Sequence, residues 1–148
     1  MKKLSKDNKG FTLVEMIVVL VILAILAAIL IPGLLGYIDD AKNKQIEIHG
    51  KAVYTAAQSV ASQYYGKNKD INTNEDDYKG EVASLSEISS FSGSATIYFQ
   101  GTTGRDAYKV VGISYTENNI TKSLKSGTSE WVDGTSSMSG AYTVTDVK

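Results

Sequence analysis

The sequence predicts an α+β fold in which a long N-terminal α-helix, membrane-spanning in one half and amphipathic in the other, packs against a small antiparallel β-sheet head. Three observations predict it. Residues 16–35 contain no charged or hydroxyl-bearing side chain, residues 36–65 repeat apolar residues every three or four positions, and short alternating runs follow Gly66. The predicted divisions are a leader at residues 1–10, a membrane helix at 11–35, an amphipathic helix at 36–65 and a head at 66–148.

The apolar stretch is long enough to cross a bilayer, since a spanning helix needs about 20 such residues. Lysines outnumber acids before it, and Asp39 and Asp40 follow it. The positive-inside rule therefore places the N-terminus in the cytoplasm and the rest of the chain outside. A secretory signal has a shorter apolar region, about 7–15 residues, that ends at a cleavage site. Because this stretch continues into a helical pattern, we expect it to be retained.

Glu15 is a carboxylate at the edge of the apolar segment. A charged side chain inside a membrane costs roughly 2.5–3.5 kcal/mol on insertion scales. Either its carboxylate reaches headgroup water, or it meets a cation once helices pack together. An α-amino group created by cleavage after Gly10 is better placed for this than Lys9. Such a pair specifies helix register more than it adds net stability.

Residues 9–15 read KGFTLVE and precede a long apolar helix. This pattern resembles the prepilin signature of type IV pilins and related pseudopilins, specifically over residues 1–40 and loosely to about Tyr65. The resemblance implies that a membrane prepilin peptidase cleaves between Gly10 and Phe11 and methylates the new amine of Phe11. It also implies that Glu15 pairs with the Phe11 amine of a neighbouring subunit, and that the fold is the type IV pilin fold.

The resemblance further implies a major pilin: a structural subunit that polymerises into cell-surface filaments for adhesion, twitching motility and biofilm formation. Its partners would be other copies, the peptidase, a membrane platform protein, assembly ATPases, the membrane before assembly, and a host or abiotic surface. Some family members take up DNA, but nearly balanced charge, with Lys+Arg 15 and Asp+Glu 16, gives no support for nucleic-acid binding. The absence of cysteine departs from the many pilins with a C-terminal disulfide and suits a Gram-positive host.

Two other functions stay open from the sequence. A pseudopilin of a type II secretion or competence apparatus would share the N-terminus but form a short fibre. A monomeric signal-anchored surface binding protein would make Gly10 and Glu15 accidental. The cluster of Pro32, Gly33 and Gly36 is either a simple kink or a weak point that extends in an assembled filament, and many pilins carry a proline at this place.

The amphipathic half is expected to face the sheet with one alanine-rich stripe, and His49 beside that stripe is expected to pack or lie at the surface. The stripe consists of Ile38, Ala41, Gln45, Ile48, Ala52, Ala56 and Val60. Alternation then predicts strands near residues 95–100, 108–115, 120–125 and 141–147, joined as an antiparallel meander with a turn at Asn118-Asn119.

No catalytic cluster, phosphate loop or nucleophile with a suitable base stands out, so we predict no enzyme and no cofactor. The nearest approach to a metal site has the spacing of an EF-hand loop, through Asp70, Asn72, Asn74, Asp76 and Glu81. Glu75 stands where that loop needs glycine, and Asp77 stands where it has an apolar residue. An acidic surface loop is the favoured interpretation.

Overall fold

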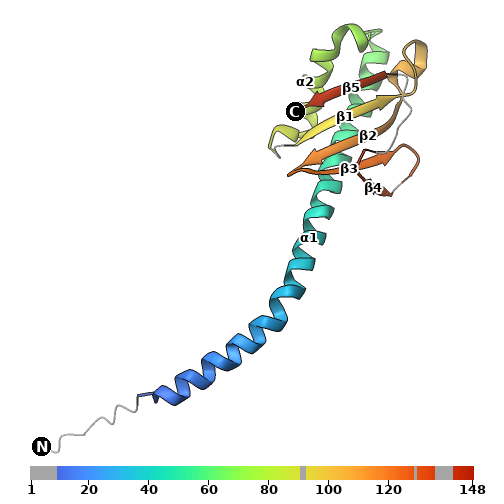
Figure 1. The fold of residues 1–148 in the computed structure, drawn as a ribbon. Helices are drawn as coiled ribbons and strands as arrows, with labels where there is room; N and C mark the ends of the chain where they lie inside the picture. The colour runs from blue at the N-terminus through green and yellow to red at the C-terminus, as the bar shows by residue number, and fades with distance from the viewer. Residues whose placement is uncertain (1–9, 91–92, 129, 136–141) are drawn as a thin grey trace, which may run out of the picture. The chain divides into compact units, whose positions relative to one another are not determined.

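The computed structural model describes residues 10–90, 93–128, 130–135 and 142–148. It divides the chain into two compact units, Met1–Asp40 and Ala41–Lys148. Helix α1 (Leu13–Gly66) contributes to both units (Figure 1). The other helical elements are η1 (Asn72–Asn74), α2 (Glu75–Ser86), η2 (Ile88–Ser90) and η3 (Gly104–Tyr108). The strands are β1 (Ser94–Phe99), β2 (Val110–Glu117), β3 (Ile120–Lys125), β4 (Trp131–Asp133) and β5 (Tyr142–Val147).

The first unit consists of the apolar part of α1. Every described residue from Gly10 to Asp40 is exposed in the single chain, including all of its large apolar side chains. This is the one helix, in the described part of the chain, that is long and apolar enough to cross a membrane. A helix that is apolar all round needs lipid or other protein around it.

The second unit is built on a five-stranded sheet of order β4-β3-β2-β1-β5, antiparallel throughout. Asn118 and Asn119 have φ of 52° and 64°, as a tight two-residue hairpin turn between β2 and β3 requires. The predicted α+β architecture is therefore confirmed. The predicted meander holds for β1, β2 and β3, and β4 is an additional strand beside β3, whereas β5 returns to the opposite edge and pairs with β1.

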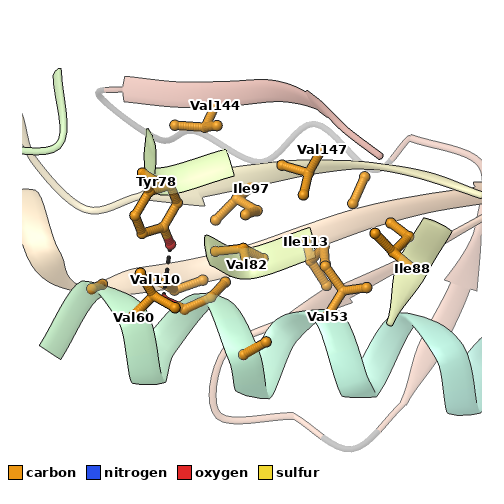
Figure 2. Packing of buried hydrophobic residues seen from close by; sticks show 14 of the residues in the cluster. Val53, Val60, Tyr78, Val82, Ile88, Ile97, Val110, Ile113, Val144 and Val147 are labelled. Carbon is orange, nitrogen blue, oxygen red and sulfur yellow. Dashed lines mark hydrogen bonds between the residues drawn. The ribbon is translucent and has the colours of Figure 1, made fainter. Parts of the chain in front are cut away.

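The core lies between the second half of α1, α2 and one face of the sheet. Figure 2 shows Val53 and Val60 of α1, Tyr78 and Val82 of α2, and side chains of the sheet converging on one cluster. On β1 the buried and half-buried positions alternate, as the sequence predicts for a half-buried strand. The Tyr78 hydroxyl donates to the backbone oxygen of Ala57 at 2.8 Å, which ties α2 to α1.

The prediction that one alanine-rich stripe of α1 faces the sheet is wrong for part of that stripe. Ile48 is 68% exposed and Ala52 is also exposed, although Ala56 and Val60 are buried as expected. The face that packs on the sheet runs instead through Ile46, Gly50, Val53, Ala56, Ala57, Val60, Ala61 and Tyr64. The missing side chain of Gly50 makes this possible, because a Cβ there would lie 2.5 Å from the Trp131 ring.

The expected acidic loop is also wrong for residues 75–81, which belong to α2. Glu75 and two following acids occupy the first turn of α2, where negative charge is favourable. Glu75 accepts a hydrogen bond from the Tyr142 hydroxyl of β5 at 2.8 Å and pairs with Lys79 at 2.7 Å. The hydrogen bonds from Lys79 and then Tyr142 lower the pKa of Glu75. The Tyr142 contact therefore stabilises α2 at its position beside β5, whereas the Lys79 pair lies within α2 itself.

Candidate functional site

The candidate processing site is the peptide bond between Gly10 and Phe11. Residues 10–12 precede α1 and are not helical, so this bond lies outside any regular element. The Phe11 side chain is 81% exposed, and no atom lies within 4 Å of the place where a Cβ on Gly10 would stand. A protease can therefore reach this bond without unwinding the helix. Lys9 and the rest of the leader lie outside the described residues.

Glu15 lies in the first turn of α1 and is bonded to Thr12. Its Oε2 accepts the backbone N–H of Thr12 at 2.7 Å and the Thr12 hydroxyl at 2.8 Å. The backbone N–H of Glu15 in turn donates to the Thr12 hydroxyl oxygen at 3.3 Å. This reciprocal pattern is a capping box, and it satisfies donors that the helix start leaves without a partner.

The capping box gives the Glu15 carboxylate a partner in its own chain. Thr12 is therefore a local partner of Glu15 in addition to the headgroup water or the cation expected above, and the Thr-x-x-Glu signature of a capping box is present in the sequence. Both Thr12 bonds end on Oε2, and Glu15 is exposed. A further donor, such as an ammonium group, can therefore approach the carboxylate while Thr12 remains bonded to it.

The cluster of Pro32, Gly33 and Gly36 lies inside α1, and the residues on both sides of it are helical. All three are exposed, and no neighbouring atom lies within 4 Å of either glycine's Cβ position. Proline has no N–H to donate to the carbonyl of Ala28, so one backbone hydrogen bond is missing at this point. The single chain therefore holds the cluster as helix, and the choice between a kink and an extensible segment stays open.

The structure does not assemble the EF-hand-like residues into a cation site. The Asp70 carboxylate accepts the backbone N–H of Asn72 at 2.9 Å, and the Asn74 amide donates to the Asp70 carbonyl at 2.7 Å. Asp76 lies in α2, and Glu81 on the same helix accepts the Tyr64 hydroxyl at 3.2 Å. In the described ranges, no three His, Asp or Glu side chains are grouped so that they could hold a metal ion.

A second polar cluster lies where α1 meets β2, and no pattern in the sequence indicates it. His49 Nδ1 and Glu117 Oε2 are 2.7 Å apart, and the Tyr115 hydroxyl donates to the same oxygen at 2.8 Å. Burial and the bond to Glu117 raise the pKa of Tyr115. The His49 ring also meets the Tyr115 ring edge-on. These contacts join α1 to the sheet, which is a structural role.

Comparison with known proteins matches residues 5–31 to a family model described as the prokaryotic N-terminal methylation motif. Gly10, Phe11 and Glu15 all lie inside this match. The chain is 38% identical over 61 residues to the type IV major pilin protein PilA of Myxococcus xanthus, which covers 41% of this chain and only 28% of that protein. It is 31% identical over 117 residues to PilA4, the type IV wide pilus major component of Thermus thermophilus, covering 70% of this chain and 88% of that protein. No solved structure matches significantly.

Proposed function

This chain belongs to the type IV pilin family, as a structural subunit rather than an enzyme, and on that premise we propose how its parts divide the work. Residues 1–10 are removed as a leader, residues 11–35 anchor the subunit in the membrane and then form the filament core, and residues 66–148 face outward. The amphipathic residues 36–65 join the anchor to the head. The complete exposure of the apolar segment in the single chain supports the division, because it must be covered by lipid before assembly and by other copies afterwards.

In this proposal, a prepilin peptidase cuts between Gly10 and Phe11 and the Phe11 amine is methylated. The accessible, non-helical bond supports cleavage, and the N-terminal methylation motif supports the modification. Mass spectrometry of the native protein tests both: the expected N-terminus is methylated Phe11. An intact Met1 would refute the processing and favour a monomeric anchored protein instead.

Glu15 then acts in assembly by pairing with the Phe11 amine of a neighbouring copy. Both helices are apolar along residues 16–35, so this pair is the directional contact that sets their register. The bonds from Thr12 lower the cost of holding Glu15 in the membrane before the partner arrives. A charged amine would add a stronger, charge-assisted bond to the same carboxylate.

Two substitutions separate the charge of Glu15 from its role as a cap. Glu15→Ala removes both, whereas Glu15→Gln keeps a side chain that suits a capping box but carries no charge. We expect both variants to insert in the membrane and neither to form filaments. Normal filaments from Glu15→Gln would show that the cap, and not the ion pair, is what assembly needs. Normal filaments from Glu15→Ala would remove the assembly role altogether.

The filament would serve adhesion, twitching motility and biofilm formation on a host or abiotic surface, and would be built by a platform protein and assembly ATPases. Both relatives named above are major components of type IV pili, which favours a pilin over a pseudopilin. Electron microscopy of sheared surface material tests this assignment. Abundant long fibres that contain this chain are expected, whereas their absence from cells that express and process the protein would favour the pseudopilin.

Pro32, Gly33 and Gly36 would make the filament extensible by letting the helix unwind locally when subunits pack. The missing hydrogen bond at Pro32 and the freedom of both glycines support this role. A Pro32→Ala variant is expected to remain helical there in a filament density map. A wild-type filament in which residues 32–36 remain helical would refute the proposed local unwinding.

A further inference from the structure

The tip of the hairpin between β2 and β3 carries the one Asn-x-Ser/Thr sequence in the chain. Asn119, Ile120 and Thr121 form this sequon, the acceptor pattern for an N-linked sugar, which occurs in surface loops of exported proteins. Asn118 and Asn119 are both exposed, and both have positive φ in the turn. Glycine serves such a turn as well as asparagine, so the turn by itself does not require an amide at position 119.

A polar hollow with a volume of about 550 Å³ lies beside this turn. It is lined by Gly93 and Ser94 where β1 begins, by residues 116–119 of the hairpin, and by Lys148. Apart from the glycine, every lining residue carries a hydroxyl, carboxyl, amide or ammonium group. Pockets for apolar ligands are lined mainly by hydrophobic and aromatic side chains, so this hollow suits a ligand with hydroxyl groups on several sides, such as a saccharide.

Glu117 is the most buried charged residue of this hollow, at 5% exposure. Its Oε2 accepts the Tyr115 hydroxyl and lies 2.7 Å from Nδ1 of His49. Within the described part of the chain, no hydrogen bond of Glu117 ends on Oε1. The carboxylate is therefore held in place through one oxygen, and the other oxygen remains available to accept a hydroxyl group of a sugar.

We propose that the side-chain amide of Asn119 is an N-glycosylation site and that the first sugar lies over this hollow. The inference rests on the proposed function, because the head must leave the cytoplasm to meet a sugar donor at the outer face of the membrane. That donor is an oligosaccharide carried on a polyprenyl diphosphate. The amide nitrogen forms a bond to C1 of the sugar, and the C1–O bond to the diphosphate breaks. The diphosphate leaves with the electron pair, the amide loses one proton, and nothing is oxidised or reduced.

The contacts of Thr121 determine when this transfer takes place. Its hydroxyl lies 2.8 Å from the hydroxyl of Thr116, the residue opposite it in the hairpin. An enzyme that recognises the Thr121 hydroxyl therefore needs the two strands apart, so transfer precedes the pairing of β2 with β3. After folding, the sugar can remain in solvent because Asn119 is exposed.

Mass spectrometry of the protein purified from its own cells tests the modification. Trypsin cuts after Lys109 and Lys122, so a single peptide of residues 110–122 contains Asn119. We expect this peptide to carry the mass of a sugar, both in membranes and in sheared filaments, and its fragment ions to place that sugar on Asn119. An unmodified peptide from processed, filament-forming protein overturns the inference and leaves the pilin function intact. A sugar on a serine or threonine hydroxyl of the peptide also overturns it, whereas failure to form filaments would refute the proposed function whether or not the sugar is present.

A first pair of variants separates the acceptor amide from the turn. Asn119→Gly and Asn118→Gly place glycine at neighbouring positions that both have positive φ, so both variants keep a turn that glycine favours. We expect Asn119→Gly to lose the sugar completely and Asn118→Gly to keep it. Loss of the sugar from both variants would show that the turn, and not the Asn119 amide, is what the modification needs, and would overturn the assignment.

A second pair separates the sequon hydroxyl from the contact across the hairpin. Thr121→Val and Thr116→Val each remove one member of the same hydroxyl pair and keep a β-branched side chain that suits a strand. We expect Thr121→Val to lose the sugar, and Thr121→Ser and Thr116→Val to keep it. A sugar that persists on Asn119 in Thr121→Val, or that is lost equally from Thr116→Val, would overturn the inference.

Discussion

The close approach of α1 to the sheet at Gly50 makes a prediction that can be worked from distances. A Cβ at this position would lie 2.5 Å from Cη2 of Trp131 and 3.1 Å from Cβ of Tyr115. Favourable carbon contacts are about 3.5–4.0 Å, so Gly50→Ala forces the helix and sheet apart. Overpacking of this kind costs about 1–3 kcal/mol, while the better helix propensity of alanine returns about 1 kcal/mol. We expect a net loss of up to about 2 kcal/mol in the free energy of unfolding.

Gly80→Ala is the matched control, because Gly80 is also helical but no atom lies within 4 Å of its Cβ position. At Gly80 the better helix propensity of alanine acts without any steric cost, so this variant should be about 1 kcal/mol more stable than the wild type. Urea unfolding of the protein in detergent measures both, followed by the fluorescence of Trp131, the one tryptophan in the chain. Equal stabilisation by the two substitutions would show that the Trp131 ring moves aside freely and would refute the reasoning.

Three further predictions concern hydrogen bonds. Thr12→Val removes the hydroxyl of the capping box, and losing a helix cap costs about 1 kcal/mol. The Met16 amide, which donates to the backbone oxygen of Thr12, should therefore exchange its hydrogen about fivefold faster, whereas Thr12→Ser should leave the rate unchanged. NMR of the protein in micelles measures this exchange. Tyr78→Phe should lose about 1 kcal/mol of unfolding free energy, since its hydroxyl no longer reaches the backbone oxygen of Ala57. The pKa of Glu75 is lowered in the folded protein, so its hydrogen bonds stabilise the fold fully above the unfolded-state pKa of about 4.5. This stabilisation is lost as the pH falls through the lower pKa of the folded state. Glu75→Gln should therefore lower the free energy of unfolding by less than about 1 kcal/mol at pH 7, because the Glu75 side chain is partly exposed. In strong acid the substitution should have no effect, and unfolding measured at both pH values tests this.

Strands β1, β2, β3 and β5 could be predicted because their residues follow local patterns. The alternation in β1 and the asparagine pair after Glu117 specify strand and turn without reference to the rest of the chain. By contrast, β4 is three residues long and shows no alternation, so it depends on pairing with β3. The edge of the sheet at which β5 lies likewise depends on its pairing with β1 and its packing against α2, which the local sequence does not encode.

The helices were harder to predict, for two different reasons. Residues 75–86 are polar apart from a few positions, and their helix is stabilised by burying Tyr78 and Val82 against the rest of the core. On α1 both faces have apolar residues at helical spacing, so the pattern alone could not say which face meets the sheet. Gly50 decides it, because only a residue without a side chain leaves room for Trp131.

At the candidate assembly site, the motif residues Gly10, Phe11 and Glu15 could be picked out from sequence, while their geometry could not. The local bonds between Thr12 and Glu15 are encoded in the Thr-x-x-Glu signature of a capping box, whereas a partner for Glu15 on another subunit is not encoded in the local sequence. The contact between His49 and Glu117 joins residues 68 positions apart and follows no periodicity, so only the fold reveals it.

If Glu15 pairs with the amine of a neighbouring copy as proposed, the capping box changes what assembly has to accomplish at this residue. Without Thr12, an unassembled subunit would hold a carboxylate at the membrane edge with no partner, and much of the driving force for assembly would be relief of that cost. With Thr12 bonded to Oε2, the unassembled state is already partly satisfied. The incoming ammonium then gains only the difference between its own bond and solvation, which is small for ion pairs. On this argument the ion pair selects the register, and the bulk of the association energy comes from the apolar surface of residues 13–35.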